Sequence, residues 1–213
     1  MPLIIYGIIY LTWFIYLEQK VTKNYRVIHV ALDDYIPFCE GFVIPYFLWF
    51  LYVSATVAYF FFKDKDDYYR TCIFLFTGMT IFLIISTLFP NGHHLRPQVM
   101  PRDNIFTWMV SCLYSTDTPT NLWPSIHVYN SLGAHFAIVK SNKLCENRPV
   151  RAISLLLCIS IILSTMFIKQ HSVFDVVTAF IMAALMYGVV YKYDILTMHR
   201  LRAMRKKATP QIN

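Results

Sequence analysis

Charged residues are scarce in this sequence. Only 15% of its 213 residues are Asp, Glu, Lys or Arg, whereas 57% are hydrophobic and the mean hydropathy is +0.47. Soluble domains carry about 25% charged residues and a smaller share of apolar ones. The composition therefore excludes an ordinary soluble domain and indicates an integral membrane protein.

Two other features are also lacking. The apolar N-terminal stretch has no charged n-region and no small-residue cleavage site, so residues 2–17 are expected to form a retained span and not a removable signal peptide. The five cysteines show neither a CxxC spacing nor a zinc-type pairing. Most of them are therefore expected to be apolar packing residues, and they do not indicate a redox compartment.

Long apolar runs are what the chain does have, and they predict an all-α fold. Runs of about 20 predominantly apolar residues are typical of membrane-spanning helices. We expect a single membrane domain over residues 1–213, a six-helix transmembrane bundle with a basic tail at residues 192–213. The expected spans are residues 2–17, 42–62, 71–88, 125–139, 150–168 and 173–191.

The connections between these spans differ in kind. The sequence KDKDDYYR (63–70) predicts a tight charged turn. The longest connection, residues 91–124, is rich in Trp, Phe and Leu, which argues against disorder, and NIFTWMVSCLYS within it predicts a short interfacial helix. Connections of this length are usually functional when they are ordered.

The positive charges predict the orientation in the membrane. With six spans, thirteen of the nineteen Lys and Arg residues fall on the side of both termini, and six fall on the other side. By the positive-inside rule, both termini are cytoplasmic in a multi-pass protein of the cell membrane. The connection 91–124 and the turn before residue 173 then share the outer face. The basic tail fits anionic lipid headgroups better than nucleic acid.

The sequence STMFIKQHSVFD (164–175) brings ionisable groups to the start of the last apolar helix. If a helix opens at Ser172, His171 and Asp175 lie one turn apart on the same face. The carboxylate would accept a proton from one imidazole nitrogen and leave the other lone pair free to attack. The alternative is a structural His–Asp pair that locks two helix ends.

A second set of polar residues precedes the fourth span. Ser125 would stand at the helix N-terminus, where unpaired amides bind phosphate, and His127 could donate a proton to a departing oxygen. Upstream, Arg96 offers a fork of donors suited to phosphate oxygens. The outer face would thus combine two histidines, a carboxylate, an arginine and a serine.

In these motifs the sequence resembles the type 2 phosphatidic acid phosphatase superfamily, whose signatures are KxxxxxxRP, PSGH and SRxxxxxHxxxD. The matching residues here are Arg96-Pro97, PSIH at 124–127, and Ser164 with His171 and Asp175, within a catalytic core of about 85–190. DTPTNLWPSIHV and KQHSVFDVVTA look like the branch of inositol phosphorylceramide and sphingomyelin synthases. The resemblance implies a bundle of that kind, with His171 as nucleophile, Asp175 as its partner, His127 as acid and base, and phosphate oxygens held by Arg96, Ser125 and Ser164. It implies neither metal nor cofactor.

Two positions depart from the family pattern. Phe89 stands where the first signature has lysine, and Thr165 stands where the third has arginine. Two cationic phosphate ligands are therefore missing, although charge stabilisation is most of what a protein contributes to phosphoryl transfer. The candidate replacements are Lys169, which we favour, and Arg102, His93 and His94.

The expected function is a membrane-embedded, metal-independent lipid phosphate phosphatase that forms a phosphohistidine. A phosphotransferase that passes a phospho-headgroup to an alcohol is the second hypothesis. Two further hypotheses are a metal hydrolase using His93, His94, His127 and His171, and a non-catalytic lipid-binding relative. The expected partners are a lipid phosphate and the bilayer, with no nucleic acid, and the sequence leaves lipid identity and oligomeric state open.

Overall fold

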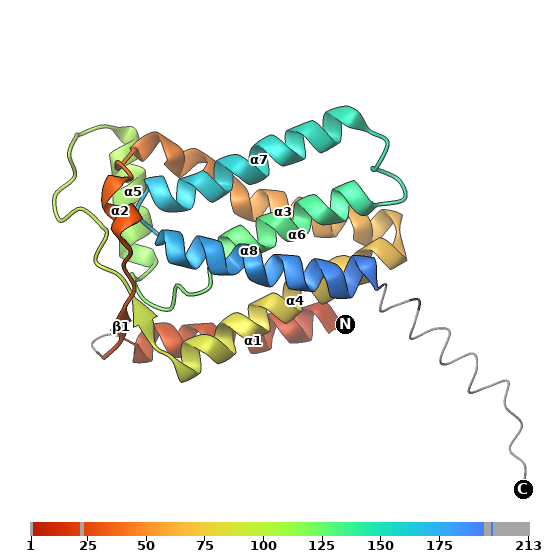
Figure 1. The fold of residues 1–213 in the computed structure, drawn as a ribbon, viewed down its shortest axis with the longest axis horizontal. Helices are drawn as coiled ribbons and strands as arrows, with labels where there is room; N and C mark the ends of the chain where they lie inside the picture. Colours follow the sequence, from red (N-terminus) through yellow and green to blue (C-terminus); the bar gives the residue numbers. More distant parts are fainter. Residues whose placement is uncertain (1, 22–23, 194–196, 198–213) are drawn as a thin grey trace, which may run out of the picture.

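The computed structural model describes residues 2–21, 24–193 and 197, and within these residues the fold is helical apart from one pair of two-residue strands (Figure 1). The expectation of an all-α fold is confirmed. Most of the expected basic tail, residues 192–213, lies outside the described residues. The elements are α1 (Pro2–Lys20), β1 (Arg26–Val27), α2 (Ala31–Tyr35), the 3-10 helix η1 (Glu40–Phe42), α3 (Val43–Lys63), α4 (Lys65–Leu88), β2 (Asn91–Gly92), α5 (Ile105–Thr116), α6 (Ile126–Lys140), α7 (Arg148–Phe167), α8 (Val173–Tyr187) and the π-helix η2 (Gly188–Lys192).

Helices occupy all six stretches that the sequence marks as spans. Four helical stretches among the described residues are long and apolar enough to cross a membrane, namely Glu40–Lys63, Lys65–Leu88, Arg148–Phe167 and Val173–Lys192. Helix lengths and composition thus indicate a membrane protein with four such helices. The short helix expected within residues 91–124 is also present, as α5.

The bundle has two unlike ends. At the loop end, formed by residues 18–21, 24–42, 89–125 and 167–173, α2, α5 and the strands cap the helices (Figure 1). At the turn end, formed by residues 63–65, 141–147 and 188–193, the connections are short. The start of α1 lies at the same end as residues 188–193 (Figure 1).

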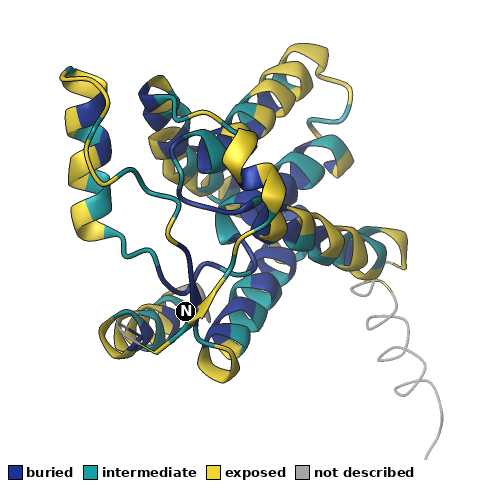
Figure 2. Ribbon diagram, turned by 60° about the vertical axis from the view of Figure 1, so that its left-hand side comes forward, coloured by how far each residue is buried: buried dark blue, intermediate teal, exposed yellow. Residues whose placement is uncertain are grey.

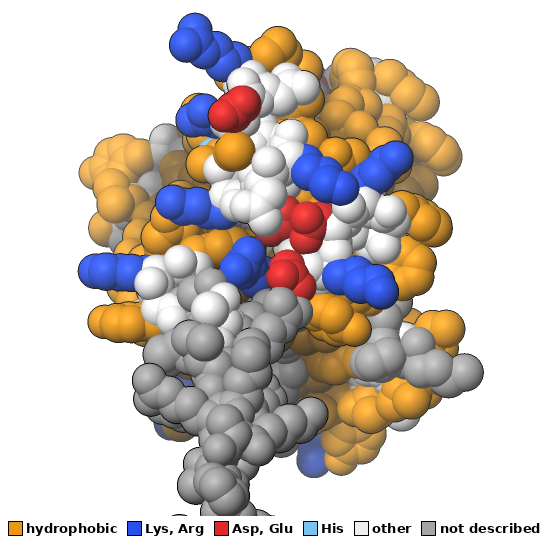
Figure 3. All heavy atoms as spheres, turned by 90° about the vertical axis from the view of Figure 1, so that its right-hand side faces the viewer, with side chains coloured by type: hydrophobic (Ala, Val, Ile, Leu, Met, Phe, Trp, Pro, Cys, Tyr) orange, Lys and Arg blue, Asp and Glu red, His pale blue; other side chains and the backbone are white. Residues whose placement is uncertain are grey.

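The tight turn expected over residues 63–70 is much shorter than predicted. Only Asp64 separates α3 from α4, because its carboxylate accepts hydrogen bonds from the backbone N–H groups of Asp66 and Asp67 and so starts α4 at once. Figure 3 shows the turn end face on, with basic side chains around a few acidic ones and apolar side chains along the flanks.

Helix α6 lies at the centre of the bundle and packs against α3, α4, α7 and α8. Buried residues face inward along these helices and exposed ones face outward (Figure 2). Many outward side chains are apolar, among them Leu156 on α7 and Ile181 on α8, which are 68% and 57% exposed. An apolar outer surface is expected where a helix bundle meets hydrocarbon.

Close approach of α4 and α6 depends on a glycine. Tyr129 of α6 is fully buried, stacks on Phe74 with ring centroids 4.8 Å apart, and donates a hydrogen bond to the Phe74 carbonyl at 2.8 Å. A Cβ on Gly78 would stand 2.0 Å from the Tyr129 ring. Gly78 therefore leaves the space that this aromatic ring fills.

At the loop end, segments far apart in the sequence are tied together. Strand β1 pairs in parallel with β2, which joins the connector after α1 to the connector after α4. The Asn91 side chain accepts hydrogen bonds from the backbone N–H groups of Leu122 and Trp123. These bonds place the residues before α6 beside the end of α4.

Candidate active site

The turn between α7 and α8 carries His171. After α7 ends at Phe167, Lys169 adopts φ = 53°, a conformation that non-glycine residues rarely take. The Thr165 carbonyl accepts hydrogen bonds from the backbone N–H groups of Gln170 and His171, both at 2.9 Å. This strained, tightly bonded turn fixes where the imidazole leaves the backbone.

Ser172 is the N-cap of α8, as the sequence predicts. Its hydroxyl accepts from the Phe174 N–H, and the Asp175 carboxylate accepts from the Ser172 N–H at 3.0 Å. This reciprocal capping places Asp175 one turn into α8 on the side of His171.

The structure brings the two predicted histidines together. His171 Nδ1 lies 3.4 Å from Asp175 Oδ2, and His171 Nε2 lies 3.4 Å from His127 Nδ1. The imidazole of His171 is 4% exposed, so it stands between a carboxylate and a second imidazole with little access to water. Both contacts are long for hydrogen bonds.

Burial gives His171 the protonation state that a nucleophile needs. Removal from water, followed by the charge of Arg96, lowers the pKa of His171 to about 3. The imidazole is therefore neutral at pH 7, with one nitrogen carrying a lone pair.

His127 lies at the start of α6 against two aromatic rings. Its ring centroid is 4.6 Å from that of Tyr46 and 4.3 Å from that of Trp49, both on α3. The wall formed by these rings leaves His127 only partly exposed.

Ser125 is the N-cap of α6, but its polar groups are used within the protein. Its hydroxyl accepts from the Val128 N–H, and its own N–H donates to the Asp175 carbonyl at 3.3 Å. The sequence predicts unpaired amides here, whereas the N–H groups of Ser125 and Val128 are both paired. The bond between Ser125 and Asp175 links the starts of α6 and α8, and the role of Ser125 on phosphate stays a prediction.

Arg96 enters the site from the loop after β2. Its Nη2 donates to Gln170 Oε1 at 2.5 Å, its Nη1 donates to the Tyr114 carbonyl at 3.3 Å, and its guanidinium lies 4.4 Å from the centroid of the Tyr114 ring. Arg96 Nε has no hydrogen-bond partner among the described residues. The cation is therefore held in place through both Nη atoms, and its Nε donor is left without a partner.

The other predicted phosphate ligands point elsewhere. The buried Ser164 hydroxyl donates to the Ile161 carbonyl of its own helix at 2.6 Å. The Lys169 ammonium donates to the backbone carbonyls of Asp33 at 2.8 Å and Ile36 at 2.5 Å. Both groups are satisfied by protein oxygens, and their phosphate-binding roles stay predictions without a supporting contact.

The remaining candidate cations are also engaged or lie apart. Arg102 forms a two-pronged pair with Glu40, with both N–O distances at 2.6 Å. The Asn104 side chain donates a further hydrogen bond to Glu40 at 3.0 Å. His94 is exposed. Arg102 thus neutralises Glu40, and within the described residues it shows no contact that would make it a replacement for the missing phosphate ligands.

His93 supports the turn between α7 and α8 that carries His171. Its Nδ1 accepts from the Leu95 N–H at 3.1 Å, so the proton lies on Nε2, which donates to the Gln170 carbonyl at 2.9 Å. Burial lowers the pKa of His93 to about 4, which keeps this tautomer neutral. His93 therefore acts as a buried tie between the loop after β2 and the residue before His171.

Sequence reasoning missed Asp33, which lies in α2, within the connector between α1 and η1. Its Oδ2 accepts from the Ser172 hydroxyl at 2.6 Å and from the Val30 N–H at 2.9 Å, and its Oδ1 accepts from the Val173 N–H at 2.8 Å. The carboxylate is 2% exposed and holds the start of α8 from outside. The adjacent acids Asp33 and Asp34 in an otherwise apolar chain were the only available signal.

Sequence reasoning also missed Asp117, Tyr46 and Gln170. Asp117 Oδ2 accepts from the Tyr46 hydroxyl and from Gln170 Nε2, both at 3.2 Å. One Gln170 side chain thus joins Arg96 to Asp117. Burial raises the pKa of Asp117 to about 6.

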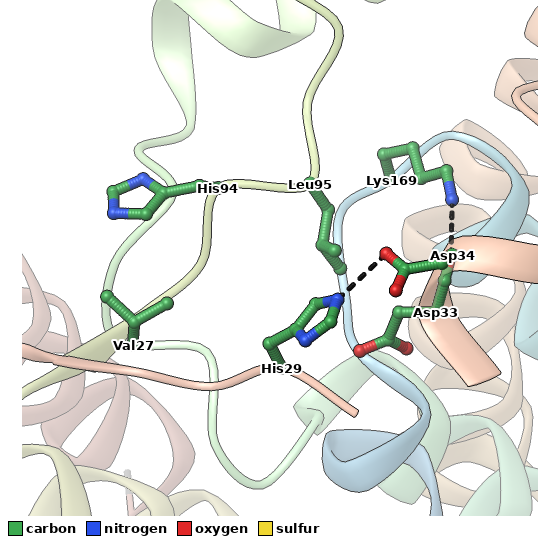
Figure 4. A pocket seen from close by; sticks show the side chains of 7 residues that line it. All are labelled: Val27, His29, Asp33, Asp34, His94, Leu95 and Lys169. Atoms are coloured by element: carbon green, nitrogen blue, oxygen red, sulfur yellow. Dashed lines mark hydrogen bonds and ion pairs between the residues drawn. The ribbon is translucent and has the colours of Figure 1, made fainter. Parts of the chain in front are cut away.

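A polar pocket lies on the neighbouring part of the loop end (Figure 4). Its volume is about 470 Å³. His29 and Asp34 form an ion pair at 2.8 Å within it, and the Lys169 ammonium points to the Asp33 backbone. The lining residues are Val27, His29, Asp33, Asp34, His94, Leu95 and Lys169.

Among the residues that the structure describes, no group of three or more His, Cys, Asp or Glu side chains is arranged to hold a metal ion. Comparisons with family models, with curated proteins and with solved structures find no match. The site is therefore interpreted from its own geometry: a neutral, buried imidazole between a carboxylate and a second imidazole, with a guanidinium close by. That arrangement suits attack on an electrophilic centre that carries negative charge.

Proposed function

We propose that this protein is a membrane-embedded enzyme that hydrolyses lipid phosphate esters through a phosphohistidine on His171. The observation that carries the proposal is the contact of His171 with both Asp175 and His127, each at 3.4 Å, beside the partly buried guanidinium of Arg96. A nucleophile, its orienting carboxylate, a proton donor and an anion-binding cation are the parts that phosphoryl transfer needs.

The reaction has two steps. In the first, the Nε2 lone pair of His171 attacks phosphorus, the N–P bond forms, the P–O bond to the lipid breaks, and a protonated His127 gives its proton to the leaving oxygen. In the second, His127 takes a proton from water as the water oxygen attacks phosphorus and the N–P bond breaks. The resting contact between the two imidazoles must open for phosphorus to enter, which requires rotation of His127.

The proposal includes the membrane arrangement. The four long apolar helical stretches, together with α1 and α6, would make six spans, with the turn end cytoplasmic and the loop end on the outer face of the cell membrane. The basic side chains at the turn end in Figure 3 support this orientation. A lipid would then reach the site sideways from the bilayer with its headgroup at the loop end.

The direct test is the His171→Ala variant in detergent micelles containing lipid phosphate and a strong chelator. With a substrate labelled in its phosphate group, wild type should release labelled phosphate. After an alkaline quench it should also retain acid-labile label on His171, because phosphohistidine is stable in base. The variant should lose at least about 10³-fold in rate and all of the label. Full turnover by the folded variant would overturn the proposal. Loss of wild-type activity in chelator would favour a metal hydrolase, and no label in any protein would favour a non-catalytic relative.

Transfer of the phospho group to an alcohol is the second candidate. The observation that favours it is the polar pocket of about 470 Å³ beside the nucleophile turn, where His29, Asp34 and His94 offer hydrogen-bonding groups to a hydroxylated acceptor. Adding alcohols to the assay distinguishes the two reactions. With a lipid phosphate monoester, hydrolysis gives inorganic phosphate throughout, whereas transfer diverts product to the phosphate monoester of the added alcohol. With a lipid phosphodiester, hydrolysis releases the phospho-headgroup, whereas transfer gives a new phosphodiester.

A further inference from the structure

The charges around Arg96 bear on which phosphate the site accepts. We propose that the site takes a phosphate group with a single negative charge, a phosphodiester or a singly protonated monoester, and that Asp117 sets this selectivity. The inference rests on the proposed function. It adds the ionic state of the substrate, which the reaction scheme leaves open.

Arg96 is the cation that acts on the nucleophile. Each of the other described Lys and Arg residues at the loop end has a partner elsewhere. Lys20 lies 5.2 Å from the centroid of the Tyr16 ring, and Arg26 lies 5.8 Å from that of Phe89. Arg102 pairs with Glu40, and Lys169 with two backbone carbonyls. Within the part of the chain that the structure describes, one guanidinium therefore faces the incoming phosphate.

Two carboxylates oppose that single cation. Asp117 shares the Gln170 amide with Arg96, and it exerts the strongest charge effect on the guanidinium. Glu18, at the end of α1, accepts hydrogen bonds from Thr118 and Asn121 and also acts on both Arg96 and Asp117. Before substrate binds, the positive charge at Arg96 is thus already offset.

The position of Asp117 relates it to Arg96, His127 and His171. Its partner Tyr46 packs on the His127 ring, and its partner Gln170 precedes His171. Asp117 is therefore separated by one side chain, that of Tyr46 or Gln170, from the residues that would surround the phosphate. From there its charge can repel a second negative charge on the phosphate without direct contact. It is a specificity-determining residue and touches no reacting atom.

A second negative charge on the substrate is therefore disfavoured. The groups that face Asp117 are Arg96, Glu18 and the Tyr46 hydroxyl, and the raised pKa of about 6 leaves Asp117 ionised at pH 8. A phosphate monoester loses its second proton near pH 6 and is a dianion at pH 8, whereas a diester stays a monoanion. The two substrates should consequently respond differently to pH.

The experiment compares dioctanoyl phosphatidic acid with its methyl diester, dioctanoyl phosphatidylmethanol, in the same micelles. Both release the same diacylglycerol, so leaving group and apolar contacts are matched. At pH 8 we expect kcat/KM to favour the diester by at least about tenfold. The preference should shrink toward pH 5 as the monoester gains its proton. In Asp117→Asn the preference at pH 8 should fall about tenfold, and in Glu18→Gln it should fall by less.

Asp103→Asn is the matched control, because it removes an exposed carboxylate from the same loop end. It should keep the wild-type preference. Equal use of both lipids by wild type at pH 8, or a preference that Asp117→Asn and Glu18→Gln leave unchanged, would overturn the inference while leaving phosphohistidine chemistry intact. The ratio of the dissociation constants of the two lipids for His171→Ala tests the same preference without turnover. Full activity of that variant would instead count against the proposed function.

Discussion

The loop end and the turn end connect the same helices by different means. At the turn end, side chains cap the helices that they begin: Asp64 caps α4, and Asn147 caps α7. The loop end has such caps too, at Ser125 and Ser172. It adds bonds between partners far apart along the chain, which among the described residues are more numerous there than at the turn end, where the Asn142 N–H donates to Asp67. Asp33 and Ser172 are 139 residues apart, and Glu18 and Asn121 are 103 apart.

The difference separates what folds the bundle from what builds the site. Local caps start helices wherever the sequence provides them, and they need no other segment. Long-range bonds require that several connectors close on one another, which costs chain entropy and is retained where geometry matters. Several buried polar residues around His171, namely Asp33, His93 and Gln170, come from such connectors. The proposed function therefore lies at the loop end, and on that proposal changes there should affect turnover more than changes elsewhere.

Replacing His127 by Ala should produce the largest contrast between the two ends. Loss of the group that protonates the leaving oxygen should lower turnover by about 10² to 10⁴-fold. The matched control is His135→Ala, because His135 lies on the same helix toward the turn end and its ring contacts the Ser154 hydroxyl at 2.9 Å. The measurement is the initial rate of lipid phosphate hydrolysis at saturating substrate. Comparable losses in both variants would remove the functional distinction between the ends.

The helices could be predicted from the sequence because each apolar run is a local signal. All six expected spans are helical, with ends displaced by a few residues where a cap such as Asp64 acts. The juxtaposition of His127 with His171 was also predicted, through two motifs and the topology. Both predictions rest on signals that are local in sequence: the apolar runs that give the helices and their order, and the two short motifs that contain the histidines.

The rest of the site could not be predicted, because its members are defined by distant partners. Asp33 lies in a connector that looks irregular, and Asp117 looks like an ordinary helix C-cap. Lys169 shows the opposite error: its position two residues before His171 suggested a phosphate ligand, but its ammonium binds carbonyls of the connector that also holds Asp33. Closeness in sequence does not fix the direction of a long side chain.

Asp33→Asn tests whether a connector outside the motifs positions the nucleophile. The variant keeps one carbonyl oxygen but turns an NH₂ group toward donors, so the start of α8 should loosen. We expect kcat to fall about tenfold with KM changed by less than about threefold, because phosphate binding through Arg96 is retained. Asp34→Asn is the control, since its carboxylate is 66% exposed and pairs with His29. Wild-type kcat in a folded Asp33→Asn protein would show that the motif turn holds its own geometry.

Gly78→Ala should have the smallest effect on turnover and a clear effect on stability. The added methyl would overlap the Tyr129 ring, which cannot move freely because it is stacked on Phe74 and hydrogen-bonded to the Phe74 carbonyl. Such overpacking should cost about 1 to 3 kcal/mol in the free energy of unfolding. Gly7→Ala, where nothing lies within 4 Å of the new Cβ, should be neutral or slightly stabilising. Thermal unfolding in detergent measures the loss of stability, and the specific activity of folded protein measures the effect on turnover.

If Gly78→Ala instead lowered specific activity as much as Asp33→Asn, helix packing would govern the site as strongly as the connectors do, and the two ends would have to be treated as one mechanical unit.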